Sequence, residues 1–275
     1  MRNLFTLLIS MVVTFSFAQR HEVGVFLGGA NVIGDIGKST YINPLPSVSG
    51  SSFDGVPLAY GLIYRYNLNP YMGLRANVIF SSVAGNDRHA PEEYKINRGY
   101  KYKNNINEGS VVFEYNLFNI NEEYGARFSP YIFGGIGFFM FDANKYIVEN
   151  SFARDENGVI LIPNEMETSI SIETEKSTKV TVPLGVGLKY KYNGFVLSAE
   201  VGFRYTNTDN LDFSFANERD FTFITEPGLP QADVNLVNGN IIRSRQVGNM
   251  SNYDWYVFTG ITLTYSFGRE PCFCD

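Results

Sequence analysis

The segment DWYVFTGITLTYSF, residues Asp254–Phe267, decides the fold. From Trp255 onward every second residue is bulky and apolar apart from Thr259, and the residues of the opposite parity become small or polar towards the end of the segment. An alternation with a period of two predicts a β-strand. The segment exceeds the usual globular strand of about five or six residues. It suits a tilted strand that crosses a bilayer, which needs about 9 to 11 residues plus an overhang.

Seven further segments earlier in the chain show the same period. They are His21–Asn31, Leu58–Leu68, Tyr71–Phe80, Gly109–Phe118, Ser129–Phe141, Lys179–Tyr192 and Phe195–Thr206. The last two are joined by Asn193-Gly194, the strongest short signal for a β-hairpin. Pro183 is expected to weaken its strand, because proline donates no hydrogen bond to the ladder. The sequence therefore predicts eight strands.

The face of these strands that lies opposite the apolar one carries charges of both signs. They are Glu22, Arg65, Arg75, Glu114, Lys189, Lys191, Glu200 and Arg204. Such a face cannot form the core of a soluble sandwich, because each unpaired buried charge would cost several kcal/mol. In a closed barrel the apolar face meets lipid and the charges pair inside. We therefore predict an all-β, eight-stranded antiparallel transmembrane β-barrel, whose side chains fill its narrow interior and leave no open pore.

The N-terminal segment MRNLFTLLISMVVTFSFAQR has the features of a secretory signal peptide: Arg2, an uncharged apolar run, and small residues before a cleavage point. We expect residues 1–18 to be removed between Ala18 and Gln19, which leaves a barrel domain at 19–267 and a tail at 268–275. The net charge of −6 and the absence of a basic cluster argue against nucleic acid as a partner. The expected location is the outer membrane, with its lipid as the surrounding solvent.

The links between the predicted strands alternate in length. Long polar links cover 31–57, 81–108, 142–178 and 207–253, and short ones cover 69–70, 119–127 and 193–194. This alternation is typical of barrels with long external loops and short periplasmic turns. An even number of strands then places both termini in the periplasm. The aromatic residues of 210–228 are expected to extend the last two strands beyond the membrane, in preference to forming an external binding surface.

Catalytic and metal-binding patterns are weak. His89 stands near Ser81, Ser82 and Asp87 in a predicted loop, but such residues are ordinary loop chemistry, and a hydrolase site is the less favoured interpretation. His21 and His89, the only histidines, lack the spacing of zinc ligands. The Gly pairs in LGGAN and FGGIG lie inside strands, so close packing explains them better than a phosphate-binding loop. We expect no catalytic residue, cofactor or metal.

The only two cysteines, Cys272 and Cys274, lie in the C-terminal tail. Glu270 and Asp275 surround them, a setting that disfavours a reactive thiolate. In an oxidising compartment the thiols should not stay free. An internal bridge would close a very small ring, so a disulfide to another protein, or a tail pressed into a partner, is favoured over an internal bridge or inert thiols.

Five stretches carry a family resemblance that covers nearly the whole mature chain. They are His21–Gly37, Asn69–Val78, Ser129–Phe139, Val182–Tyr192 and Asp254–Cys274. Together they resemble the PorG-type outer-membrane barrels of the Bacteroidota, which belong to the type IX protein secretion and gliding motility machinery. The opening stretch and the Cys-x-Cys tail are the most particular of these features.

The resemblance implies an accessory barrel that is not the translocation pore. It would hold the periplasmic ring of lipoprotein and partner subunits at the outer membrane, with the tail, residues 268–275, as the docking element. The competing class is a stand-alone barrel, either a lipid-modifying enzyme or a porin-like protein for small ligands. Replacement of both tail cysteines should distinguish the two classes, because only an assembly factor would lose its partners.

Overall fold

The computed structural model describes residues 21–38, 42, 57–122, 124–154, 166–249 and 252–267. These residues form nine strands: β1 (His21–Ile33), β2 (Leu58–Asn67), β3 (Met72–Asn86), β4 (Lys101–Asn116), β5 (Phe128–Phe152), β6 (Met166–Tyr192), β7 (Phe195–Thr206), β8 (Phe221–Thr225) and β9 (Trp255–Phe267). The helical elements are η1 (Asp87–His89), α2 (Glu93–Arg98), η2 (Glu218–Asp220) and α3 (Gln231–Ser244). Among the described residues, no helix has the length and apolar character that a membrane-spanning helix requires.

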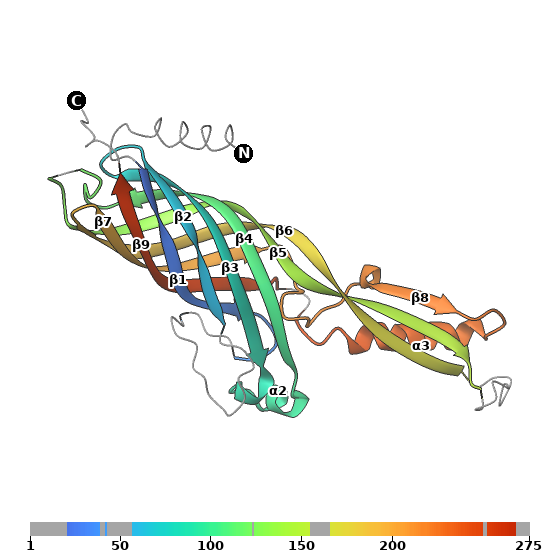
Figure 1. The fold of residues 1–275 in the computed structure, drawn as a ribbon. Helices are drawn as coiled ribbons and strands as arrows, with labels where there is room; N and C mark the ends of the chain where they lie inside the picture. Colours follow the sequence, from blue (N-terminus) through green and yellow to red (C-terminus); the bar gives the residue numbers. More distant parts are fainter. Residues whose placement is uncertain are drawn as a thin grey trace, which may run out of the picture.

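Eight of the strands close into a ring (Figure 1). The order runs from β1 through β2, β3, β4, β5, β6, β7 and β9, and β9 pairs with β1. Every neighbouring pair in the ring is antiparallel. Because a closed ring leaves no unpaired edge, the backbone polar groups can be satisfied without water. The prediction of an all-β, eight-stranded antiparallel barrel is confirmed.

One end of the barrel carries the short turns, and we call it the short-turn end. The first residue of β1, His21, pairs there with Phe267 of β9. The tightest turn is Asn193-Gly194, where Asn193 adopts a φ of 52°, a left-handed conformation that asparagine tolerates well. In β6, Pro183 coincides with an interruption of the β5–β6 ladder between the pairs Gly134–Leu184 and Gly137–Thr181. The missing N–H of proline accounts for the interruption.

The other end, called here the extended end, differs from the predicted set of long loops. Half of the predicted link 81–108 is strand, because β3 and β4 continue outward and are capped by η1 and α2. The link 142–178 contains the outer halves of β5 and β6, which are 25 and 27 residues long. Together with β8 and α3 they form an arm that projects from the barrel (Figure 1). We define the arm as residues 144–154, 166–176 and 217–245.

The aromatic residues of 210–228 do not extend the last two strands, so that expectation was wrong. β7 ends at Thr206, and β8 instead pairs in parallel with the outer part of β5, with Phe221 opposite Tyr146. Phe221 packs in a small core with Val148 and Ala216, and Ile241 and Ile242 of α3 cover it. The aromatic residues thus gain burial that an extension of β7 into water would not provide.

The outward face of the barrel is apolar. Its exposed side chains include Val23, Val25, Leu27, Leu62, Tyr64, Leu74, Val78, Val111, Phe113, Ile132, Ile136, Phe138, Val182, Leu184, Val186, Leu188, Leu197, Ile261, Leu263 and Tyr265. A soluble monomer does not expose a continuous apolar band of this kind. The band is the surface that a transmembrane barrel presents to hydrocarbon.

The interior has two layers. The layer nearer the extended end is apolar: Phe26, Ile63, Ile79, Val83, Ile106, Phe139, Phe141, Tyr256 and Phe258 pack together, and Leu211 from the β7–β8 connection completes the cluster. Tight contact between β1 and β9 depends on Gly28 and Gly260, because a Cβ at Gly28 would lie 2.7 Å from Gly260 Cα. The glycines in these strands therefore serve close packing, as predicted. The layer nearer the short-turn end is charged.

Candidate functional site: the barrel interior and its extended end

The charged layer is centred on Glu114 of β4. Its carboxylate lies 2.7 Å from Arg65 Nε, 3.1 Å from Arg75 Nε and 2.5 Å from Lys189 Nζ. The three cations come from β2, β3 and β6, so one carboxylate joins four strands of the ring. Glu114 and Arg65 have no exposed side-chain surface. A buried charge is tolerable only with such pairing.

Two further carboxylates balance these cations. Glu200 lies 2.6 Å from Arg75 Nη1 and accepts a hydrogen bond of 2.5 Å from the hydroxyl of Tyr131. Glu22 pairs with Arg65 and accepts hydrogen bonds of 2.8 Å from both Asn67 Nδ2 and Thr264 Oγ1. The arginine and lysine groups also lie over aromatic rings: Arg75 is 4.7 Å from the centroid of Phe133 and Lys189 is 4.5 Å from that of Tyr131. Such contacts add to the stability of the cations in this dry space.

One member of the charged layer was missed by the sequence analysis. Glu108 of β4 is buried, lies 3.2 Å from Arg204 Nε and accepts a hydrogen bond of 2.8 Å from the Tyr256 hydroxyl. The sequence pattern predicts it as the last residue of the long link 81–108. Its parity with Ser110, Val112 and Glu114 is the signal that could have found it. With Glu108 included, four carboxylates face four cations, and the interior is formally neutral.

The structure places seven of the eight predicted lumen charges inside the barrel. Lys191 was assigned wrongly to that set. Its Nζ donates to the carbonyl oxygens of Ile120 and Glu122, at 3.3 and 2.9 Å, in the connection between β4 and β5. Lys191 shares the parity of Lys189 but stands at the end of β6, where its long side chain leaves the interior and reaches the turn.

Acidic residues close the extended end. Asp212 accepts hydrogen bonds from the backbone N–H groups of Asp35 and Ile36, at 2.7 and 2.9 Å, and Asp254 accepts one of 2.9 Å from Leu211. These bonds join the β1–β2, β7–β8 and α3–β9 connections over the apolar layer. Asp209 also lies here, and both of its carboxylate oxygens are buried with no hydrogen-bond partner among the described residues.

Burial and mutual repulsion change the acidity of this cluster. Burial raises the pKa of Asp254 to about 9, and the nearby carboxylate of Asp212 adds to the rise. Burial also raises the pKa of Asp209 to about 7, with further contributions from Asp35 and Asp212. The pKa of Asp212 is raised by burial as well, although hydrogen bonds from Ser214 and the backbone oppose the rise. Across the described ranges, no three His, Cys, Asp or Glu side chains form a group that could hold a metal ion.

A second set of contacts at this end contains a carboxylate whose pKa is lowered, in contrast to those of the acidic cluster. Arg98 of α2 pairs with Asp87 at 2.8 Å and donates to the carbonyl oxygens of Asp35 and Val247, at 2.8 and 3.1 Å. Burial alone would raise the pKa of Asp87, but hydrogen bonds from Arg98 and from the backbone of Gly37 and Tyr100 lower it below its ordinary value. Asp87 therefore holds α2 against the mouth of the barrel as a carboxylate.

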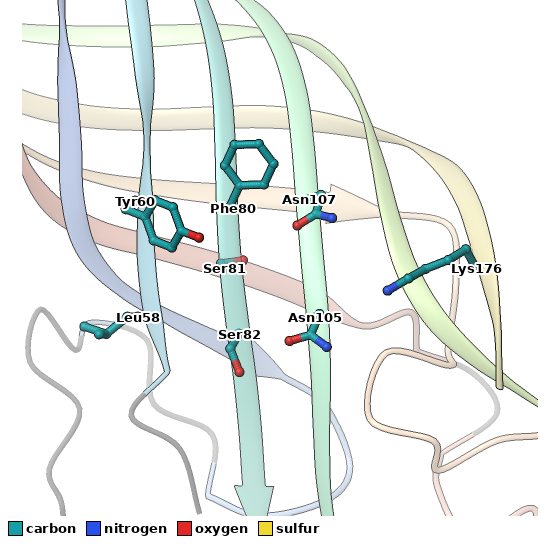
Figure 2. Close-up of a pocket in the computed structure, with 8 residues that line it drawn as sticks. All are labelled: Leu58, Tyr60, Phe80, Ser81, Ser82, Asn105, Asn107 and Lys176. Carbon is teal, nitrogen blue, oxygen red and sulfur yellow. The ribbon is translucent and has the colours of Figure 1, made fainter.

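A groove of about 380 Å³ lies on the outer wall near the extended end (Figure 2). Tyr60 of β2 and Phe80 of β3 are paired across the sheet and form its apolar side. One step outward along the strands, Ser82 and Asn105 form the next pair. Beside them, Asp142 accepts a hydrogen bond from Asn105 and pairs with Lys176. The groove marks the level at which the outer wall changes from apolar to polar.

The remaining predicted sites are not brought together. His89 is exposed at the end of η1, whereas Ser81 faces the interior and donates a hydrogen bond of 2.9 Å to the Ile106 carbonyl. His21 lies at the short-turn end, where its Nδ1 is 2.6 Å from the Tyr64 hydroxyl. The cleavage point Ala18–Gln19 and the tail with Cys272 and Cys274 lie outside the described residues.

An apolar outer band, a closed ring and a neutral, salt-bridged interior define the class of this protein: it is an eight-stranded transmembrane β-barrel with a filled lumen. The chain belongs to the family described as Domain of unknown function (DUF6089), whose model matches residues 1–275. A comparison with curated proteins gives no match.

Solved structures with a similar fold are outer-membrane barrels. The N-terminal β-barrel domain of Pseudomonas aeruginosa OprF is 12% identical, with a TM-score of 0.38 over 90% of this chain and 98% of that one. Neisserial surface protein A is 10% identical, with a TM-score of 0.40 over 90% and 97%. Ail, the attachment invasion locus protein of Yersinia pestis, is 12% identical, with a TM-score of 0.37 over 90% and 99%.

Proposed function

We propose that this protein is an outer-membrane barrel that acts as an assembly component and conducts nothing through its own lumen. The observation that carries the proposal is the bridge from Glu114 to Arg65, Arg75 and Lys189, with all four side chains at most 1% exposed. A conducting barrel needs a hydrated path, whereas these ion pairs stand in the interior beneath an apolar layer. A barrel that does not transport is free to serve as an anchor.

The particular role that we propose is that of an accessory barrel in the type IX protein secretion and gliding machinery. The support comes from the sequence segments that resemble PorG-type barrels and from the Cys-x-Cys tail. In this role the short-turn end faces the periplasm, and the tail, residues 268–275, docks the ring of lipoprotein subunits. Cys272 and Cys274 would secure the contact, by a disulfide to a partner or by insertion into its surface.

The experiment compares the wild-type protein with a C272S/C274S variant in the native organism. Membranes are solubilised in mild detergent without reductant, and the proteins that co-purify with the barrel are identified. We expect the wild type to retain periplasmic lipoprotein subunits and the variant to lose them, with a fall in cargo secretion. A mature wild-type monomer that brings no partner, and whose mobility on non-reducing gels is unchanged by reductant, would contradict the docking role.

A matched measurement tests the stand-alone alternative of a porin-like protein or a lipid-modifying enzyme. Purified barrel in a planar bilayer should give no stepwise conductance, whereas a porin-like protein would conduct. For the enzyme, H89A is the variant to compare, because His89 is exposed at the end of η1, the short helix that begins at Asp87. A lipid-modifying activity that H89A abolishes, and that C272S/C274S leaves intact, would favour the enzyme.

A further inference from the structure

The arm at the extended end contains a strand with one free edge. β6 pairs with β7 only from Thr181 onward, whereas its ladder with β5 continues outward to the pair Phe152–Met166. Among the described residues, no strand pairs with the other side of β6 between Met166 and Val180. On the far side of the arm the equivalent edge of β5 is covered by β8. The backbone groups along β6 are thus available as a template for another strand.

The two faces of this edge differ in chemistry. Ile172 is paired with Tyr146 and Ile170 with Val148, so these isoleucines share the face that α3 packs on. The helix covers β5 and β8 but leaves Ile170 39% and Ile172 51% exposed. The apolar surface of the arm therefore continues past the helix to the open edge of the sheet.

The opposite face of the same edge is acidic. This face carries Glu167, Glu173 and Glu175 together with Ser169 and Ser171, and all of them are exposed. No basic group lies within 4.0 Å of any of the three carboxylates in the described parts of the chain, whereas Lys145 beside them is already paired with Asp220 at 2.6 Å. The edge therefore presents uncompensated negative charge on one side and exposed isoleucine on the other.

We propose that the outer half of β6, Met166–Glu175, captures an extended segment of another polypeptide as an added strand. The segment that fits alternates apolar or β-branched residues, which would cover Ile170 and Ile172, with lysine or arginine, which would face the three glutamates. Main-chain hydrogen bonds supply affinity in this mode of recognition, and the alternating side chains supply specificity. Side-chain hydrogen bonds hold the outer half of β6 in place within the arm. Asn150 of β5 accepts one from Thr168 of β6 and donates one to Asn238 of α3, each of 2.9 Å.

A second copy of this chain is the less suitable occupant. If two β6 edges paired with each other, their acidic faces would come together, and like charges placed opposite one another across a sheet are destabilising. A segment with basic residues on the matching face meets no such repulsion. This inference concerns the extended end and does not rest on the docking role of the C-terminal tail.

The test uses the full chain in nanodiscs of zwitterionic lipid, so that a basic peptide is not held by the bilayer. Three fluorescent ten-residue peptides are compared by anisotropy: one alternates Lys with Ile, Val and Thr, the second carries Glu in place of Lys, and the third repeats the first with alternate backbone amides N-methylated. We expect the first peptide to bind, and the other two to bind at least about tenfold more weakly, because one lacks the charge match and the other the ladder donors.

Protein variants locate the site. E173K/E175K and I170K/I172K should each weaken binding of the basic peptide by about tenfold or more. The control is E218K, which reverses a single charge in η2, on the β8 side of the arm sheet, and should leave affinity within about twofold. Equal binding of the N-methylated peptide, equal loss in E218K, or concentration-dependent dimers that I170K/I172K abolishes would each overturn the proposal.

Discussion

Arg75 Nη1 lies 2.6 Å from Glu200 Oε2, although their strands, β3 and β7, stand opposite each other in the eight-stranded ring. The pair therefore crosses the lumen. Its two side chains are only 1% and 3% exposed, and the pair ties together strands that share no backbone hydrogen bond. The same pair explains why the interior needs both signs of charge, since neither partner could be buried alone without a large cost.

Removal of the central carboxylate should be the most damaging single change in the charged layer. In E114Q the cations of Arg65, Arg75 and Lys189 lose the acid that they share. We expect the free energy of unfolding to fall by about 3–5 kcal/mol, the usual cost of leaving buried charge uncompensated. Urea titration of the barrel folded in lipid vesicles measures it.

The control for that experiment is E175Q, which makes the same chemical change at an exposed position of the arm. It should leave the urea midpoint unchanged. If the two variants had the same midpoint, the charged layer would contribute nothing to stability, and the argument for a rigid, filled lumen would fail.

Two lysines two residues apart should respond differently to replacement by methionine. Lys189 is buried against Glu114, so K189M should cost about 3 kcal/mol or more by leaving that carboxylate short of a partner. Lys191 donates to two carbonyl oxygens of the neighbouring turn, so K191M should cost about 1 kcal/mol. The same urea titration compares them, and a larger loss in K191M would mean that Lys191 belongs to the interior.

The sequence predicted the ring because side-chain parity is a local property. Phe195–Thr206 was expected as a strand and is β7 without change, and the interior positions of Arg204 and Glu200 follow from the same count. The end of a strand is less predictable. Lys191 has the same parity as the residues that face the lumen, but it stands next to the last residue of β6. There its long side chain reaches the backbone of the β4–β5 connection.

The arm could not be predicted in the same way. β8 is five residues long, and its partner in β5 lies about 75 positions earlier, in the pair Tyr146–Phe221. A short parallel strand has no local signal that names its partner. Glu108 was not predicted as an interior residue for a related reason. The polar segment 101–108 resembles a loop in sequence, although it forms the first half of β4 and shares the side-chain alternation of that strand.

The free-energy cost of an arginine on the outer apolar band should depend on the depth of its position in the bilayer. Val186 lies midway along the apolar face of β6 and is 56% exposed, whereas Tyr192 stands next to the turn and is 61% exposed. If this face meets hydrocarbon, V186R should cost about 2–4 kcal/mol and Y192R about 0–1 kcal/mol. Folding titrations in lipid vesicles measure both. Equal costs at the two positions would mean that the band does not span a bilayer.

The acidic cluster predicts that the extended end loosens as the pH rises. A carboxyl group whose pKa is higher in the folded protein than in the unfolded chain stabilises the fold fully below the unfolded value, near pH 4, and loses that contribution as the pH rises through the folded value. The folded values are about 7 for Asp209 and about 9 for Asp254, so the loss should fall between pH 4 and 9. Protection of the Leu211 and Ile36 amides against hydrogen exchange, corrected for intrinsic rate, should decrease over this range.

Substitution tests this assignment. In D254N the amide oxygen can still accept the hydrogen bond from the Leu211 N–H without carrying charge, so protection at pH 8 should rise above that of the wild type. The opposite variant is D87N: the pKa of Asp87 is lowered in the folded protein, so its charge is stabilising above about pH 4 and its removal should reduce protection at pH 8. If D254N lost protection at pH 8 as D87N does, Asp254 would be stabilising as a carboxylate, and the extended end would not respond to pH through this cluster.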